Sequence, residues 1–110
     1  MNKGDIYLIE IPGIGGHEQI GLRPGIVFSN EIKNIVLIIP ITTKTKASTY
    51  DFTLKIPKSK DNGLDLDSVG LVFQLRAIDK KRIKNKIGVL EDNFVSQINN
   101  LIIEMLKLKW

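Results

Sequence analysis

The chain has 110 residues, of which 43% are apolar and 25% charged, which fits one globular domain and excludes a disordered tail or a fibrous repeat. It has no cysteine and one histidine, His17, so disulfides, zinc ribbons and thiol chemistry are excluded, and a metal would have to rest on carboxylates. The formal net charge of +4 permits a polyanionic partner without proving one. The longest apolar run, residues 35–39, is too short to span a membrane and no signal region is present, so we expect a cytosolic protein without a membrane partner.

Short strands are predicted over residues 6–11, 25–29, 35–41, 52–56, 69–75 and 86–89. The strand 35–41 is apolar on both faces and is expected at the centre of the sheet. The strand 52–56 alternates between apolar and polar residues, the pattern of a strand with one solvated face. A glycine-rich loop is predicted over residues 13–22, and Asn62-Gly63 indicates a turn.

The period changes at the end of the chain. Apolar residues recur at helical spacing, which predicts a helix over residues 92–108: Phe94, Val95, Ile98, Leu101, Ile102, Met105 and Leu106. Asp92 at its start, and Lys107 and Lys109 at its end, match the helix dipole. Five or six strands followed by one helix predict a mainly β, small and strongly bent barrel with the helix covering an open side.

The glycine-rich loop does not match a nucleotide-binding motif. Gly13 and Gly15 lack a third glycine at the dinucleotide spacing, and a strand rather than a helix follows them. No Walker sequence is present either. Nucleotide binding is therefore rejected, and a connection between two strands explains the loop without any function.

Four chemically distinct side chains gather at the end of this loop: His17, Glu18, Gln19 and Arg23. Pro24 restricts Arg23 to extended backbone geometry, where its guanidinium can bind a phosphate through two parallel hydrogen bonds. Spacing alone favours the simpler interpretation, in which Glu18 and Arg23 form a surface ion pair and His17 is a surface residue.

Hydroxyl and ammonium groups alternate after the predicted central strand. Thr42, Thr43, Lys44 and Lys46 offer donors and charge to phosphate oxygens, although composition alone also describes a solvated loop. The basic run over residues 80–86 is likewise either an RNA-facing surface or a solvated face.

In combination, four segments resemble the MazF/PemK family of toxin–antitoxin ribonucleases over nearly the whole chain. They are Gly4-Asp5-Ile6-Tyr7, the loop Gly16-His17-Glu18-Gln19 with Gly21-x-Arg23-Pro24, Pro40-Ile41-Thr42-Thr43, and the later block from Asp67-Ser68-Val69 through Phe73-Gln74-Leu75-Arg76 to Ala77-Ile78-Asp79-Lys80. The resemblance implies an SH3-like barrel, a homodimer, and cleavage of single-stranded RNA at short sequences in mRNA without a metal or other cofactor.

The resemblance also assigns roles. Arg23 matches the family's catalytic arginine and Thr42 its catalytic threonine, while Glu18 and Gln19 match the acidic and amide positions of the loop. RNA is cleaved by its own 2′-hydroxyl, so such an enzyme must stabilise the added negative charge, move protons and hold the geometry. The expected products carry a 2′,3′-cyclic phosphate and a 5′-hydroxyl. We expect RNA contacts from polar and basic side chains of the matching segments: Thr43, Lys44, Lys46, Ser68, Gln74 and Arg76.

One branch of the family departs from this chain. The PemK/Kid branch shares a histidine at the place of His17, but it also uses an arginine and an aspartate where this chain has Leu71 and Phe73. Its mechanism therefore cannot operate here, and the chain is closer to the branch that relies on the Arg/Thr pair. His17 becomes an auxiliary candidate for proton transfer because its free pKa lies near neutrality.

The resemblance implies a cognate acidic antitoxin, and contact with DNA only indirectly through the antitoxin complex. The alternative is a CcdB-like toxin, which shares the architecture and poisons DNA gyrase without catalysis through the end of its C-terminal helix, here residues 107–110. A degenerate, non-catalytic member is a third reading, but Arg23 and Thr42 are both present. The set of Glu18, Arg23 and Thr42 favours the ribonuclease.

Overall fold

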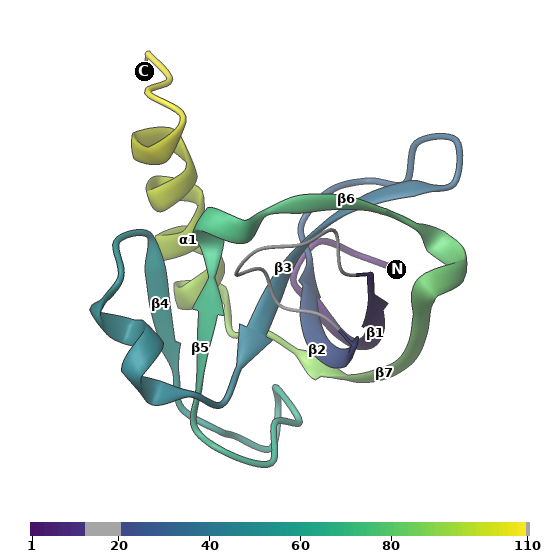
Figure 1. Ribbon diagram of the computed structural model, residues 1–110, viewed down its shortest axis with the longest axis horizontal. Helices are drawn as coiled ribbons and strands as arrows, with labels where there is room; N and C mark the ends of the chain where they lie inside the picture. The colour runs from purple at the N-terminus through teal and green to yellow at the C-terminus, as the bar shows by residue number, and fades with distance from the viewer. Residues whose placement is uncertain (13–20, 110) are drawn as a thin grey trace.

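The computed structural model describes residues 1–12 and 21–109 and consists of antiparallel strands followed by one helix (Figure 1). The elements are β1 (Asp5–Ile11), β2 (Gly21–Val27), β3 (Ile35–Thr42), β4 (Thr53–Ile56), β5 (Ser68–Leu71), β6 (Arg76–Asp79), β7 (Ile83–Val89) and α1 (Asp92–Met105), with short 3₁₀ turns η1 (Thr45–Thr49), η2 (Val72–Gln74) and η3 (Lys80–Arg82). The predicted mainly β fold with a C-terminal helix is confirmed.

β3 is the centre of the sheet, as its apolar faces predict. The hydrogen-bonded order is β4-β5-β3-β2-β1-β7, and β6 pairs with β3 off this path. β6 continues through η3 into β7, which pairs with β1. The strands β6, β3, β2, β1 and β7 therefore form a strongly bent, barrel-like ring, while β4 and β5 extend the sheet beside α1 (Figure 1).

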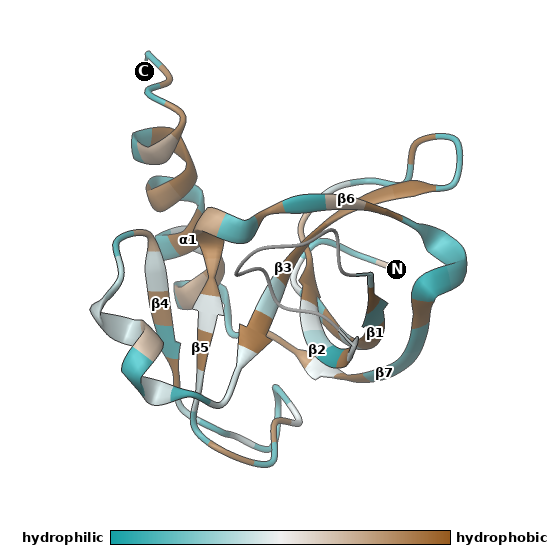
Figure 2. Ribbon diagram, viewed as in Figure 1, coloured by the Kyte–Doolittle hydropathy of each residue, from teal (hydrophilic) through white to brown (hydrophobic). Residues whose placement is uncertain are grey.

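Two apolar clusters stabilise this arrangement, one on each face of the sheet. There are two because successive side chains of a strand point to opposite faces. Along β2 and β3, Val27 and Ile38 join one cluster whereas Ile26 and Ile39 join the other. The first cluster draws only on ring strands. The second includes residues of β4 and α1, so it attaches the helix to the sheet. β3 is accordingly apolar over most of its length, whereas the outer edge at η3 is hydrophilic (Figure 2).

The predicted helix boundary at residue 108 is wrong, because α1 ends at Met105. Lys107 has a φ of 55°, in the left-handed region. Its N–H donates to the Glu104 carbonyl at 3.1 Å, and the Leu108 N–H donates to the Ile103 carbonyl at 2.9 Å. This pair of bonds is the Schellman motif, which usually needs glycine at the left-handed position. The apolar pattern beyond Met105 therefore does not continue the helix.

Several strand boundaries also differ from the prediction. The predicted strand 69–75 is interrupted, since β5 ends at Leu71 and η2 leads into β6, a strand that was not predicted. The predicted strand 25–29 begins earlier and ends earlier, because β2 starts at Gly21, which pairs with Ile11 of β1. β7 likewise begins at Ile83 rather than at residue 86. Pairing with a distant partner decides these boundaries, and the described part of the chain has seven strands.

The turn predicted at Asn62-Gly63 is confirmed and is tightly packed. Asn62 is fully buried, and its side-chain oxygen accepts the N–H groups of Ser59 at 3.0 Å and Leu64 at 3.1 Å. Gly63 has a φ of 69°, and a Cβ there would collide with the Ile87 carbonyl. The turn is therefore pressed directly against β7, and only glycine fits at position 63.

Candidate functional site

Arg23 and Thr42 lie at the same end of neighbouring strands. β2 and β3 are antiparallel, and their paired residues run from Val27–Ile38 to Gly25–Pro40. Arg23 and Thr42 each lie two residues beyond this last pair, at the same end of the two strands. Arg23 is exposed whereas Thr42 is only 3% exposed. The same end of β2 and β3 therefore carries an exposed guanidinium and a buried hydroxyl.

Thr42 is held by the turn that follows β3. It pairs with Val69 of β5, and its Oγ1 accepts the Lys44 N–H at 3.2 Å. A hydroxyl has one proton to donate and two acceptor lone pairs, so this bond leaves the proton available for an anionic oxygen. The same bond directs the chain from β3 into η1, which carries the next basic residues.

An open groove of about 750 Å³ begins at Thr42. It contains four of the residues predicted from the sequence: Thr42, Lys44, Lys46 and Gln74. The other residues that line it are Ala47, Tyr50, Asp51, Phe52, Leu71 and Phe73. Two ammonium groups face one carboxylate here, so the groove is positively charged overall and suits an anion such as a phosphodiester.

The aromatic lining of this groove was not predicted from the sequence. Tyr50 lies in no predicted element, and Phe73 falls within a predicted strand that the structure breaks at η2. Their ring centroids are 6.2 Å apart with an interplanar angle of 86°. One sequence signal could have pointed to them. Tyr50 adjoins Asp51 and Phe73 adjoins Gln74, so each aromatic residue stands next to a polar one at the edge of an apolar segment.

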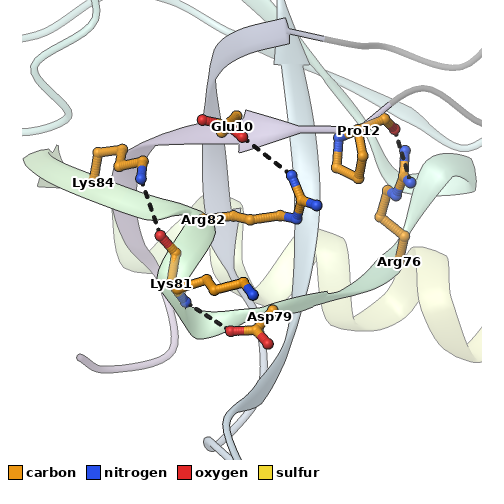
Figure 3. Close-up of polar contacts among 7 residues, drawn as sticks. All are labelled: Glu10, Pro12, Arg76, Asp79, Lys81, Arg82 and Lys84. Atoms are coloured by element: carbon orange, nitrogen blue, oxygen red, sulfur yellow. Dashed lines mark hydrogen bonds and ion pairs between the residues drawn. The ribbon is translucent and has the colours of Figure 1, made fainter.

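Arg76 does not line the groove. It lies on β6, opposite Ile38 of β3, and its guanidinium donates to the Pro12 carbonyl at 3.1 Å (Figure 3). This hydrogen bond connects β6 to Pro12, the residue that directly follows β1. Contact between Arg76 and RNA stays a prediction.

Thr43 and Ser68 are also outside this groove. Thr43 is exposed beside Thr42, whereas Ser68 is 4% exposed and its hydroxyl donates to the Leu66 carbonyl at 2.8 Å. Ser68 lines a separate hollow of about 400 Å³, together with Lys55. Their predicted RNA contacts stay predictions, with Ser68 the less accessible of the two.

The basic run over residues 80–86 is largely engaged within the molecule. Lys80 pairs with Glu31 at 3.1 Å, Arg82 with Glu10 at 3.1 Å and Lys86 with Asp5 at 3.5 Å. The Lys84 ammonium donates to the Lys81 carbonyl at 3.1 Å, and the Asp79 carboxylate caps the Lys81 N–H at 2.9 Å (Figure 3). These contacts favour the interpretation of this run as a solvated face rather than an RNA-binding surface.

His17, Glu18 and Gln19 lie outside the described residues, so their predicted roles stay predictions. The two positions that distinguish the PemK/Kid branch are described. Leu71 is 2% exposed in the core and Phe73 is 42% exposed in the groove. Neither side chain can replace the missing arginine and aspartate.

A shifted pKa is found away from the groove, at Glu91 just before α1. Burial raises the pKa of this carboxyl, but hydrogen bonds from Ser59 Oγ, from its own backbone N–H and from Asn62 outweigh burial, so the pKa is lower than usual. Glu91 therefore belongs to the buried turn rather than to a catalytic centre. Within residues 1–12 and 21–109, no group of three or more metal-ligating side chains is found, and no helix is long and apolar enough to cross a membrane.

Comparison with solved structures places the fold. MazF from Deinococcus radiodurans superimposes with a TM-score of 0.82 at 20% identity, covering 98% of this chain and 97% of that one. The Mycobacterium tuberculosis toxin MazF-mt6 superimposes with a TM-score of 0.76 at 18% identity, covering 96% and 99%. A Deinococcus radiodurans MazE–MazF structure gives a TM-score of 0.77 at 21% identity, covering 99% and 97%.

The fold is thus that of the MazF structures. Comparison of sequences then identifies the protein family. A family profile described as PemK-like, MazF-like toxin of type II toxin–antitoxin system matches residues 2–106, and the chain belongs to this family. It is also 36% identical over 106 residues to the endoribonuclease MazF of Staphylococcus saprophyticus subsp. saprophyticus, covering 93% of this chain and 88% of the relative. These matches do not favour the CcdB-like alternative.

Proposed function

We propose that this toxin is an endoribonuclease that cleaves single-stranded RNA, chiefly mRNA, at short specific sequences. The observation that supports the proposal is that Arg23 and Thr42 each lie two residues beyond the last β2–β3 pair, at the same end of these strands, and that Thr42 lines a positively charged groove. A phosphodiester lying across this edge meets both side chains at once, while the Lys44 and Lys46 ammonium groups hold neighbouring phosphates.

The reaction follows from these two side chains. The ribose 2′-hydroxyl loses its proton, O2′ bonds to phosphorus and the bond from phosphorus to O5′ breaks, so O5′ takes up a proton and the other fragment retains a 2′,3′-cyclic phosphate. The phosphorus carries more negative charge in the transition state than in the substrate. Arg23 supplies a positive charge and paired donors to that charge, and Thr42 donates one hydrogen bond to a non-bridging oxygen.

Proton transfer requires further groups, because a guanidinium has too high a pKa to exchange protons readily near neutral pH. His17 and Glu18 are the candidates from the preceding segment: an imidazole titrates near neutrality, and a carboxylate can accept the 2′-hydroxyl proton. Gln19 is assigned to orientation of the substrate. This division gives the charge-stabilising role to Arg23 and Thr42, and no step in it uses a metal ion.

The partners follow from the same groove. We infer a homodimer acting in the cytosol, since its mRNA substrate is cytosolic, and a cognate acidic antitoxin that competes with RNA for the basic groove. DNA would be contacted only through the antitoxin complex. MazE–MazF complexes among the structural neighbours support the antitoxin part of this proposal.

The decisive experiment incubates the purified protein with mixed-sequence single-stranded RNA in excess EDTA and maps both ends of every product. We expect discrete cuts that leave a 2′,3′-cyclic phosphate and a 5′-hydroxyl, and no cuts with the Arg23→Ala/Thr42→Ala double variant. Cleavage that occurs only after a divalent metal is added would contradict the metal-independent mechanism. Intact RNA together with inhibited gyrase supercoiling would support the CcdB-like alternative instead.

A further inference from the structure

The aromatic rings of Tyr50 and Phe73 line the groove and are exposed to solvent, where polar side chains would be expected. Tyr50 is 62% exposed and Phe73 is 42% exposed. Tyr50 directly follows η1 and Phe73 lies in η2, two turns that are separated by two strands in the sequence, and the two rings meet edge to face. Exposed apolar groups gathered in a concave, charged surface indicate a ligand with both apolar and anionic parts.

The backbone that carries these rings is firmly held. Phe52 has a φ of 58°, a conformation that is rare for a bulky side chain, while its ring packs on the core. Its carbonyl accepts the Phe73 N–H at 3.1 Å. The Tyr50 carbonyl accepts the Thr53 hydroxyl at 2.9 Å, and the Tyr50 N–H donates to Ala47 at 3.1 Å. The two rings are thus presented by a fixed frame.

We propose that Tyr50 and Phe73 form a stacking site for one nucleobase of the RNA and thereby set part of the sequence preference of cleavage. The inference rests on the proposed function and deepens it. In an edge-to-face pair, the ring that offers its edge keeps both faces clear of its partner, so a planar base can lie against it. Every nucleobase has such a face, and stacking on aromatic side chains is the usual way in which proteins hold single-stranded RNA.

The Asp51 carboxylate favours a nucleobase over the apolar side chain of an acidic peptide, although both would satisfy the lysines. A base in an RNA strand is always flanked by phosphates, and the groove supplies the Lys44 and Lys46 ammonium groups on the η1 side of the rings. The Asp51 carboxylate, which also lines the groove, can accept a hydrogen bond from an exocyclic amino group. A base with its two phosphates therefore satisfies the rings, the lysines and the carboxylate together.

The test measures kcat/KM on RNA of mixed sequence, with the cut sites mapped, for Tyr50→Ser and Phe73→Leu. Tyr50→Phe is the conservative variant, and Ile32→Ser is the matched control because Ile32 is 69% exposed and does not line the groove. Loss of one stacked base lowers kcat/KM by about tenfold to a hundredfold. We expect that loss for the first two variants, with a changed base preference at one position of the cut site. Tyr50→Phe, which keeps the ring, should lose less than Tyr50→Ser, and Ile32→Ser should behave as the wild type. Circular dichroism and the melting temperature verify that each variant is folded.

A second measurement separates this inference from the proposed function. Single-stranded 2′-O-methyl oligonucleotides that contain 2-aminopurine cannot be cut, and stacking on a ring quenches their fluorescence. Quenching by the wild type that is lost in Tyr50→Ser supports the stacking site even if RNA is never cleaved. Cleavage by folded Tyr50→Ser and Phe73→Leu at wild-type rates and sites overturns it. Unchanged RNA binding with loss of antitoxin binding would assign the rings to the protein partner and also overturn it.

Discussion

Arg23 and Thr42 differ in burial, and this difference separates their roles. Thr42 is buried at the end of β3 and hydrogen-bonded by Lys44, so its hydroxyl is held in place before substrate arrives. Arg23 is exposed on β2, so a phosphate can reach its guanidinium. In the proposed reaction, a buried hydroxyl and an exposed positive charge would together stabilise the charge that develops in the transition state.

Removing either group is therefore expected to slow cleavage severely while the protein stays folded. Loss of one transition-state donor costs about 10²–10³-fold in kcat. We expect this for Arg23→Ala and for Thr42→Val, which keeps the shape of the side chain. Arg23→Lys keeps the charge but loses the paired donors, so its cleavage rate should lie between those of the wild type and Arg23→Ala. Single-turnover kinetics on a mapped RNA measures these rates, and near-normal turnover by either of the first two variants would contradict the site.

Glu91 makes the free energy of unfolding depend on pH in the acidic range. Its carboxylate accepts a hydrogen bond from Ser59 Oγ at 2.7 Å and one from Asn62 Nδ2 at 3.3 Å. Because its pKa is lower in the folded state than in the unfolded state, the carboxylate contributes fully to the free energy of unfolding above the unfolded pKa, about 4.3. The contribution is lost as the pH falls through the folded pKa.

Glu91→Gln should accordingly destabilise the protein at neutral pH, by about 1–2 kcal/mol because hydrogen bonds to a charged group are lost. The difference between wild type and variant should shrink as the pH falls from 6 to 3. Urea unfolding at a series of pH values measures both effects. A constant difference across this range would show that the carboxylate charge is not what the turn uses.

At the scale of elements, the end of the helix depends on a single residue. α1 stops because Lys107 takes a left-handed conformation and its neighbours close a Schellman motif. A lysine there is strained, whereas glycine would not be. The strain is local to the end of the helix, which lies outside the groove.

Lys107→Gly should therefore stabilise the protein, by about 0.5–1 kcal/mol, without changing cleavage. Lys107→Ala is the matched control, because it removes the same charge but keeps a Cβ and should give no gain. Thermal unfolding of both variants compares them. Equal stability of the glycine and alanine variants would show that the left-handed conformation does not limit the helix end.

At the scale of the whole molecule, the groove is short in comparison with an extended RNA strand, which needs a longer track to be gripped over several nucleotides. In the proposed homodimer, a second copy of the chain would supply that track. We expect sedimentation at micromolar concentration to give a species of twice 12.4 kDa. A 12.4 kDa species that cleaves RNA at full rate would contradict the homodimer.

The distribution of charge predicts how an antitoxin binds. Acidic partners occupy much of the basic run over residues 80–86, whereas Lys44 and Lys46 line the groove. An acidic antitoxin segment that uses them should bind less tightly as salt rises and should compete with RNA. Titration at several salt concentrations measures this, with Lys44→Ala/Lys46→Ala expected to reduce the salt dependence. Antitoxin that binds equally at high salt, or together with RNA, would place the inhibitory contact elsewhere.

Local patterns in the sequence determined the class of fold and the first members of the site. The apolar run of β3 is long enough to show that it is buried on both faces, and the helical period around Ile98 depends only on neighbouring residues. Arg23 and Thr42 were found because each belongs to a short motif whose residues are close in sequence. Such features need no knowledge of distant partners.

The tertiary structure alone decided which of these residues meet. Arg23 and Thr42 come to the same end of neighbouring strands because β2 and β3 pair in antiparallel register, and Arg76 on β6, which pairs with β3, reaches the Pro12 carbonyl. The aromatic groove exists only where η1 and η2 converge, joined by the hydrogen bond between Phe52 and Phe73. Strand pairing and long-range hydrogen bonds depend on segments far apart in the chain, so no local pattern could predict them.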